Sequence, residues 1–259
     1  MVIRRHVAGN FSRSAETYEQ AASFQRHAAS LLAQSLAAWH PAPGGVSSIL
    51  ELGCGTGFLT RQLLSLFPNA RIIATDISGR MLARCSENLA EGETQGRLEL
   101  LESEAHDALR RYAKSSQLVV AGLVLQWVPD LSAILSLSHE LLPPGGQMAF
   151  STLSDATFSS LRNSFAESAS AYPGPRLLSL SEIREACSKF PELQISEAIH
   201  RQSHPSLREF LRHLQETGAG NASGRPVPPG TLRRIIRKAG VSSFDADYHL
   251  LICLCKKGG

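Results

Sequence analysis

The sequence predicts an α/β fold built on a doubly wound, mostly parallel sheet, and two observations lead to this prediction. Short apolar segments typical of buried strands alternate with helical stretches; we expect strands at 48–52, 70–75, 97–101, 118–122 and 147–152, and helices near 57–67, 79–90, 105–113 and 131–142. Strands joined through helices of this length form parallel sheets covered on both faces. A glycine-rich turn also follows the first strand, where such sheets open into a ligand crevice.

Helices are expected before and after this alternating core. Residues 11–39 carry apolar side chains at helical spacing and predict a helical lid, which HPAPGG at 40–45 ends. After the fifth strand we expect a helical insertion, with helices near 155–170 and 179–188, a strand near 193–200, two more helices and a last strand near 247–255. The 259 residues suit one domain. Its expected parts are the lid (1–45), a ligand-binding core (46–153) and a part that binds substrate and partner (154–259).

The composition, with 43% apolar and 19% charged residues, is typical of a folded, water-soluble chain. No uncharged apolar stretch approaches the roughly 18 residues of a membrane span, and no signal peptide is visible. The five cysteines are an odd number without C-x-x-C spacing, so we expect neither disulfides nor a metal site, and a cytoplasmic location. Residues 201–238 hold eight basic and two acidic side chains, a candidate surface for an acidic partner.

The turn ELGCGTG at residues 51–57 lets the backbone approach a ligand closely. Its G-x-G-x-G spacing differs from the dinucleotide fingerprint, and it lacks the Lys-Ser/Thr pair of a phosphate-binding loop. Asp76, at the end of the second strand, is placed to accept hydrogen bonds from both hydroxyls of a ribose. Glu104, after the third strand, is placed to accept a hydrogen bond from an adenine amino group. Together with Glu51, these residues place three acidic side chains around the expected nucleoside. Such a set suits a ligand that carries positive charge and no phosphate, and S-adenosylmethionine meets that description.

With these features the chain resembles the class I S-adenosylmethionine-dependent methyltransferases over residues 48–153. The resemblance rests on ELGCGTG, Asp76, the pair Glu104-Ala105, the segment VVAGLVLQWVPD after the fourth strand and the LLPPGG turn. It implies a Rossmann-like sheet of seven strands; an NAD-binding unit of the same topology is the alternative. The residues expected to hold the cofactor are Gln25, Glu51, Gly53, Gly55, Gly57, Asp76, Ile77, Met81, Glu104, Ala105 and Gly122.

Segments along nearly the whole chain resemble one family, the malonyl-[acyl-carrier protein] O-methyltransferases of biotin synthesis. They are FSRSAETYEQAASFQRHAA at 11–29, LQWVPDLSAIL at 125–135, FSTL at 150–153, LRHLQETGAGNASGR at 211–225 and DYHLLICLCKK at 247–257. The family often shows G-D-A-E where this chain reads SEAH at 103–106, so the identity of the adenine-binding acid stays open. Methyltransferases of amino nitrogens usually carry N/D-P-P-Y/F where this chain has GLVL at 122–125, so a nucleobase substrate is not expected.

The resemblance implies methyl transfer to the free carboxylate of a malonyl thioester on acyl-carrier protein or coenzyme A, an early step of biotin (pimeloyl) synthesis. A carboxylate with a pKa near ~4 is ionised at pH 7, so we expect an anchor for it and no general base. Arg176 is the leading candidate for that anchor. Tyr18 and Gln25 are expected on one face of a helix over the cofactor, and Gln126 and Trp127 beside the methyl group.

An acidic carrier protein is expected to dock on basic side chains, namely Arg208, Arg212, Arg233, Arg234 and Arg237. Neither nucleic acid nor a membrane is expected as a partner, and the oligomeric state stays open. Two other functions also stay open. The first is methylation of another small carboxylate, such as trans-aconitate, or of a quinone-type hydroxyl, which needs a base such as His106, His139 or His249. The second is a non-catalytic subunit that binds S-adenosylmethionine to stabilise a partner.

Overall fold

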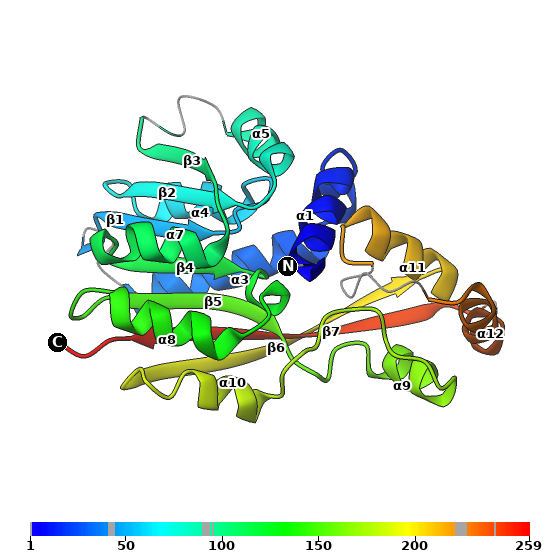
Figure 1. The fold of residues 1–259 in the computed structure, drawn as a ribbon. Helices are drawn as coiled ribbons and strands as arrows, with labels where there is room; N and C mark the ends of the chain where they lie inside the picture. Colours follow the sequence, from blue (N-terminus) through cyan, green and yellow to red (C-terminus); the bar gives the residue numbers. More distant parts are fainter. Residues whose placement is uncertain (1, 41–44, 90–93, 95, 221–226, 241) are drawn as a thin grey trace.

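The structure is a computed structural model that describes residues 2–40, 45–89, 94, 96–220, 227–240 and 242–259. Its centre is a seven-stranded sheet in the order β3-β2-β1-β4-β5-β7-β6 (Figure 1). Strands β1 to β5 run parallel, and β7 is antiparallel to both β5 and β6. The mostly parallel, doubly wound sheet is thus confirmed. The strands are β1 Ser48–Leu52, β2 Arg71–Asp76, β3 Leu98–Glu102, β4 Leu118–Gly122, β5 Gln147–Leu153, β6 Glu192–His204 and β7 Phe244–Lys256.

Helices cover both faces of the sheet because successive side chains of a strand point to opposite faces. Along β4, Leu118 and Val120 join the apolar core under α3 and α4, whereas Val119 and Ala121 join the core under α7 and α8. Figure 1 shows α7 and α8 in front of the sheet and α3 and α4 behind it. These helices are α3 Ser23–Trp39, α4 Phe58–Leu66 and α5 Gly79–Asn88 on one face, and α7 Ala105–Tyr112, α8 Leu131–Leu141 and α10 Leu180–Ala186 on the other.

The N-terminal lid consists of α1 Val2–Ser14, α2 Tyr18–Ala21 and α3. Hydrogen bonds tie its first two helices to α5 and to the glycine-rich turn. The hydroxyls of Ser12 and Ser78 are 2.8 Å apart. The Asn88 side-chain amide donates to Glu19 Oε1 (2.7 Å) and to the carbonyl of Thr56 (2.9 Å). These bonds hold α1 and α2 beside the carboxyl edge of the parallel strands.

The prediction that Tyr18 and Gln25 share one helix face is wrong, because the lid breaks between them. Ala22, with φ −86° and ψ 40°, separates α2 from α3. The break allows Tyr18 to stack on Phe58 in α4, with ring centroids 6.2 Å apart. Packing against distant parts of the chain, rather than local helical periodicity, therefore decides the course of the lid.

The C-terminal part extends the sheet beyond its predicted length. Strands β6 and β7 have 13 residues each, and their outer halves carry α9 Ser159–Glu167, α11 Leu207–Glu216 and α12 Pro229–Ala239 (Figure 1). Tyr248 of β7 is the centre of this packing, with its ring centroid 3.9 Å from that of Phe24 and 4.7 Å from that of Phe158. Among the described helices, none is long and apolar enough to cross a membrane.

Candidate active site

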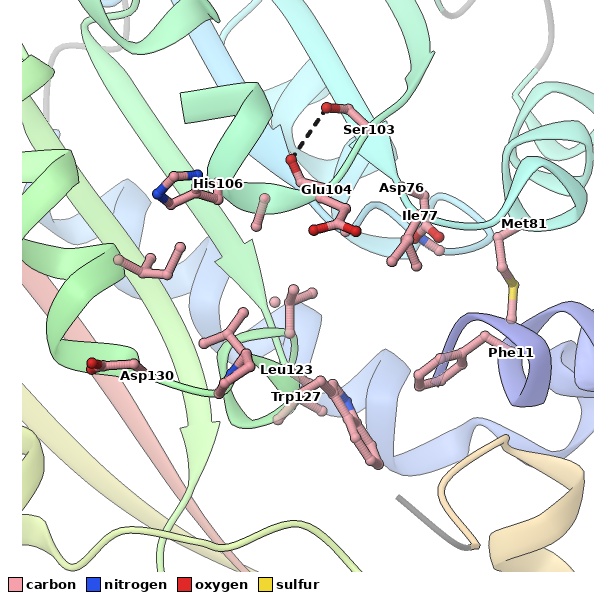
Figure 2. A pocket seen from close by; sticks show the side chains of 18 of the residues that line it. Phe11, Asp76, Ile77, Met81, Ser103, Glu104, His106, Leu123, Trp127 and Asp130 are labelled. Atoms are coloured by element: carbon pink, nitrogen blue, oxygen red, sulfur yellow. Dashed lines mark hydrogen bonds between the residues drawn. The ribbon is translucent and has the colours of Figure 1, made fainter. Parts of the chain in front are cut away.

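A cavity of about 330 Å³, here called the cofactor cavity, opens between α1, α5, α7 and α8 at the carboxyl edge of the sheet (Figure 2). Its volume is within the roughly 300–1,000 Å³ of small-molecule sites. Figure 2 shows Asp76 and Glu104 on one side of it and Leu123 and Trp127 on the other. The predicted cofactor residues that line it are Gly53, Gly55, Asp76, Ile77, Met81, Glu104, Ala105 and Gly122.

The glycine-rich turn forms the floor of this cavity. Gly53 has a φ of 66°, and a Cβ there would lie 2.3 Å from Val124 Cγ2, so only glycine fits. Gly57, with a φ of 97°, lines none of the cavities described here; a Cβ on it would lie 2.9 Å from Cys85 Sγ. The first glycine thus exposes its backbone to the cofactor cavity, and the last packs the turn on α5.

Asp76 presents a carboxylate to the cofactor cavity from the end of β2. Its Oδ2 accepts a hydrogen bond from the N–H of Gly55 and its Oδ1 one from the N–H of Ser78, each at 2.9 Å. Burial raises the pKa of Asp76, and the N–H groups act against that rise by stabilising the anion. Each carboxylate oxygen has a second lone pair for a hydroxyl donor, so the geometry suits a ribose.

The opposite end of the cavity starts at α7. Glu104 and Ala105 line it, and the Ser103 hydroxyl donates to the Glu104 carbonyl at 3.2 Å (Figure 2). His106 and Asp130 complete this end, and the sequence analysis did not assign either to the cofactor. The role of Glu104 as acceptor of the adenine amino group stays a prediction.

A second, smaller cavity of about 50 Å³ lies where the lid covers the glycine-rich turn. Three buried oxygens from residues lining it, Gln25 Oε1, Glu51 Oε2 and Thr56 Oγ1, have no hydrogen-bond partner among the described residues. Burial raises the pKa of Glu51 to about 8; the neighbouring Thr60 hydroxyl acts against this rise, and the charge of Asp76 adds a smaller contribution to it. Buried acceptors without donors fit a ligand that carries a cationic ammonium group. Together, the two cavities fit the nucleoside and amino-acid ends of S-adenosylmethionine.

A third cavity of about 70 Å³, here called the acceptor cavity, adjoins the cofactor cavity. Lining residues of both cavities are Phe11, Tyr18, Leu123 and Trp127. Phe11 of α1 meets Trp127 edge to face, with ring centroids 5.4 Å apart. This aromatic pair stands between the two cavities, so a group bound in the acceptor cavity lies next to the cofactor.

The acceptor cavity holds neutral hydrogen-bonding groups. Tyr18, Tyr172 and Tyr248 line it, and burial raises the pKa of all three phenols, that of Tyr172 to about 12. Gln126 also lines this cavity and not the cofactor cavity; its Nε2 donates to the carbonyl of Leu123 at 2.8 Å. At neutral pH the three phenols keep their protons and are potential donors to an anion.

Arg176 lies outside both cavities, contrary to its predicted place beside the acceptor carboxylate. Its side chain is 78% exposed, and its Nη2 is 2.6 Å from Glu182 Oε1. Glu182 Oε2 in turn accepts the N–H of Ser179 at 2.8 Å, which caps α10. The prediction fails geometrically because the sequence does not reveal this ion pair, which directs Arg176 toward α10.

The five arginines predicted to dock a carrier protein are exposed on α11 and α12, and none lines the cofactor or acceptor cavity. Two of them have other partners. Arg212 pairs with Glu209 and Glu216 of its own helix, and Arg234 donates to the carbonyl of Ser168 at 2.8 Å. The other three are Arg208, Arg233 and Arg237.

Sequence reasoning did not assign several residues that line the site. Thr56 lies inside the glycine-rich turn, and Phe11 begins one of the segments that resemble the family. The sequence therefore contained enough information to place both residues at the site. Tyr172 lies in a Pro-rich connection without periodicity. Only the folded chain brings it to the acceptor cavity.

Comparisons with known proteins agree with this site. A family model described as a methyltransferase domain matches residues 49–146. The YcgJ protein of Bacillus subtilis has the same fold, with a TM-score of 0.59, 13% identity, and coverage of 90% of this chain and 99% of that chain. The fold and the cofactor cavity define a class I methyltransferase, with S-adenosylmethionine as the methyl donor.

Two curated relatives identify the family within this class. One from Magnetococcus marinus, named malonyl-[acyl-carrier protein] O-methyltransferase, is 35% identical over 249 residues, which are 95% of this chain and 90% of the relative. Another of the same name from Halalkalibacterium halodurans is 30% identical over 269 residues, 98% of each chain. The chain belongs to the family of malonyl-[acyl-carrier protein] O-methyltransferases.

Proposed function

We propose that this enzyme transfers the methyl group of S-adenosylmethionine to the free carboxylate of a malonyl group held as a thioester on acyl-carrier protein, an early step of biotin synthesis. The names of the relatives support this substrate. The structural observation that carries the proposal is the character of the acceptor cavity: among its described lining residues there is no acid, histidine, lysine or arginine.

A cavity of this kind suits an acceptor that needs no general base. A carboxylate is ionised at neutral pH and attacks the sulfonium methyl without losing a proton. S-adenosylmethionine supplies an activated methyl group when bound. The chain's own contribution is to orient the carboxylate, through the O–H groups of Tyr18, Tyr172 and Tyr248, and to keep water away with the pair Phe11 and Trp127.

The alternative of a quinone-type hydroxyl has less support, because it requires a base beside the acceptor. His106 lines the cofactor cavity at the α7 end, and His139 packs edge-on against Phe190 at 5.1 Å between ring centroids. His249 lies in β7 and, like the other two, does not line the acceptor cavity. A different small carboxylate, such as trans-aconitate, remains the competing acceptor.

We assign the three parts of the chain different tasks within one domain: residues 1–45 close the site, 46–153 hold the cofactor and 154–259 bind the substrate and its carrier. Residues 41–44 of the first part and 221–226 of the last lie outside the described residues. The arginines of α11 and α12 are proposed to attract an acidic carrier protein. The five cysteines, all buried and free, support the reducing cytoplasm as its location.

The substrate assignment is tested by incubating the protein with labelled S-adenosylmethionine and one of four acceptors: malonyl-carrier protein, malonyl-coenzyme A, succinyl-carrier protein or trans-aconitate. The methylated species is then identified by mass spectrometry. We expect a methyl ester on the malonyl-carrier protein, and at a higher kcat/KM than on trans-aconitate. Methylation of trans-aconitate alone contradicts the proposal, and no methylation of any acceptor favours a non-catalytic binding subunit.

A further inference from the structure

A groove of about 970 Å³, here called the α8–α10 groove, is larger than the cofactor and acceptor cavities and has no task in methyl transfer as described above. It lies between α8, α10 and the segment after β4. It adjoins the acceptor cavity, since four residues line both: Gln126, Trp127, Leu153 and Pro175. A molecule lying in the groove therefore has one end at the acceptor cavity.

The groove is elongated along α10. It reaches from Gly174 and Arg176, before α10, to Ser188 and Lys189, after it. The seven residues of Leu180–Ala186 account for about 10 Å of this length at 1.5 Å per residue. This shape suits a long, narrow occupant better than a compact one.

The walls of the groove combine apolar and hydroxyl groups with charged side chains, which are Asp130, Arg176, Glu182, Glu185 and Lys189. α8 contributes Ser132 and Ser136, and α10 contributes Ile183 and Ala186. Such walls suit a flexible chain that alternates hydrocarbon with amide groups, because the hydroxyls can pair with the amides while the aliphatic side chains contact the methylenes.

The two ends of the groove differ in charge. At the end near the acceptor cavity, Arg176 is neutralised by its ion pair with Glu182. At the far end, Lys189 lines the groove, with Glu185 of α10 among the other lining residues. The exposed ammonium group of Lys189 suits an anionic group at this end.

We propose that the α8–α10 groove receives the phosphopantetheine arm of the malonyl carrier protein, with the thioester beside Gln126 and Trp127 and the phosphodiester beside Lys189. This inference rests on the proposed function and adds the path of the substrate to it. The carrier protein then meets the enzyme at the Lys189 end of the groove, and the arginines of α11 and α12 are proposed to aid its approach and not to hold the arm.

Two variants test the groove, and each has a matched control. Ser132→Trp fills it with a ring from an exposed position on α8, and Lys189→Glu reverses the charge at its far end. The controls are Ser160→Trp on α9 and Lys114→Glu, both exposed and outside the lining of the groove. Thermal unfolding and S-adenosylmethionine binding check that each variant is folded.

The measured quantity is the ratio of kcat/KM for malonyl-carrier protein to kcat/KM for malonyl-N-acetylcysteamine, which lacks the phosphate and most of the arm. We expect Ser132→Trp to lower this ratio at least about 30-fold, and Lys189→Glu about tenfold, which corresponds to about 1.4 kcal/mol. The controls should keep the wild-type ratio.

An unchanged ratio in both groove variants overturns the inference, as does an equal fall in the control variants. A fall on Arg233→Glu/Arg237→Glu without one on Lys189→Glu or Ser132→Trp would place the arm at α12 and also overturn it. Failure of the proposed function gives a different result, because the wild-type enzyme would then methylate neither malonyl thioester.

Discussion

Glu51 makes a sharp prediction about cofactor binding, because its buried carboxyl carries a proton when the cofactor is absent. Burial raises the pKa of this group to about 8, so at pH 7 about nine-tenths of the molecules hold the proton. An ammonium group beside Glu51 Oε2 lowers that pKa again. We therefore expect S-adenosylmethionine binding at pH 7 to release about 0.7–0.9 proton, after allowing for the ordinary α-amino pKa of about 7.8 on the ligand.

The assay is isothermal titration calorimetry at pH 7 in two buffers with different ionisation enthalpies, since the difference in apparent binding enthalpy gives the number of protons released. Glu51→Gln should release none and should bind S-adenosylmethionine about 10–100-fold more weakly at pH 8, from a lost charge-assisted hydrogen bond of about 1.5–3 kcal/mol. Glu99→Gln is the control, because within the described part of the chain the Glu99 side chain forms only an exposed ion pair with Arg71. Equal proton release by wild type and Glu51→Gln would refute the reasoning.

The same group gives the cofactor-free protein a pH-dependent stability. The folded-state pKa is raised above the ordinary value of 4.5, so the stability from protonated Glu51 is complete below pH 4.5 and is lost as the pH rises through 8. A pKa of about 8 corresponds to a loss of up to about 4 kcal/mol by pH 8. Glu51→Gln should thus raise the Tm of the cofactor-free protein at pH 8 and leave it nearly unchanged at pH 4.5.

Three further experiments test other parts of the structure. Asp76→Ala should weaken S-adenosylmethionine binding by at least about tenfold in calorimetry, because it removes the ribose acceptors and leaves two backbone N–H groups unpaired. Gly57→Ala should lower the unfolding free energy by about 1–3 kcal/mol in urea titration, more than Gly145→Ala, which has a positive φ but open space around its Cβ. A double-mutant cycle on Phe11→Ala and Trp127→Ala should give a coupling of about 0.5–1.5 kcal/mol in unfolding; additive effects would contradict their contact.

Much of the core was predictable because its signals are local. The strands of the parallel sheet begin and end within one residue of the predicted bounds, since each is a short apolar segment between turn residues. The turn at 51–57 requires glycine at defined backbone angles, and Asp76 follows from its place at a strand end. Signals of this kind are readable in one sequence without any knowledge of distant contacts.

The sequence by itself determined the sheet, the glycine-rich turn and the acids that line the cavities at its carboxyl edge, because strand patterning and turn geometry depend on neighbouring residues. Only the tertiary structure decided what lies beyond them. It brought Tyr172 and Tyr248 from distant segments into one cavity, broke the lid at Ala22, and paired Arg176 with Glu182 outside that cavity. The cavity and the break in the lid depend on contacts between residues far apart in the chain, which the spacing of residues does not encode. The ion pair joins residues only six apart, but it depends on the path of the irregular connection before α10.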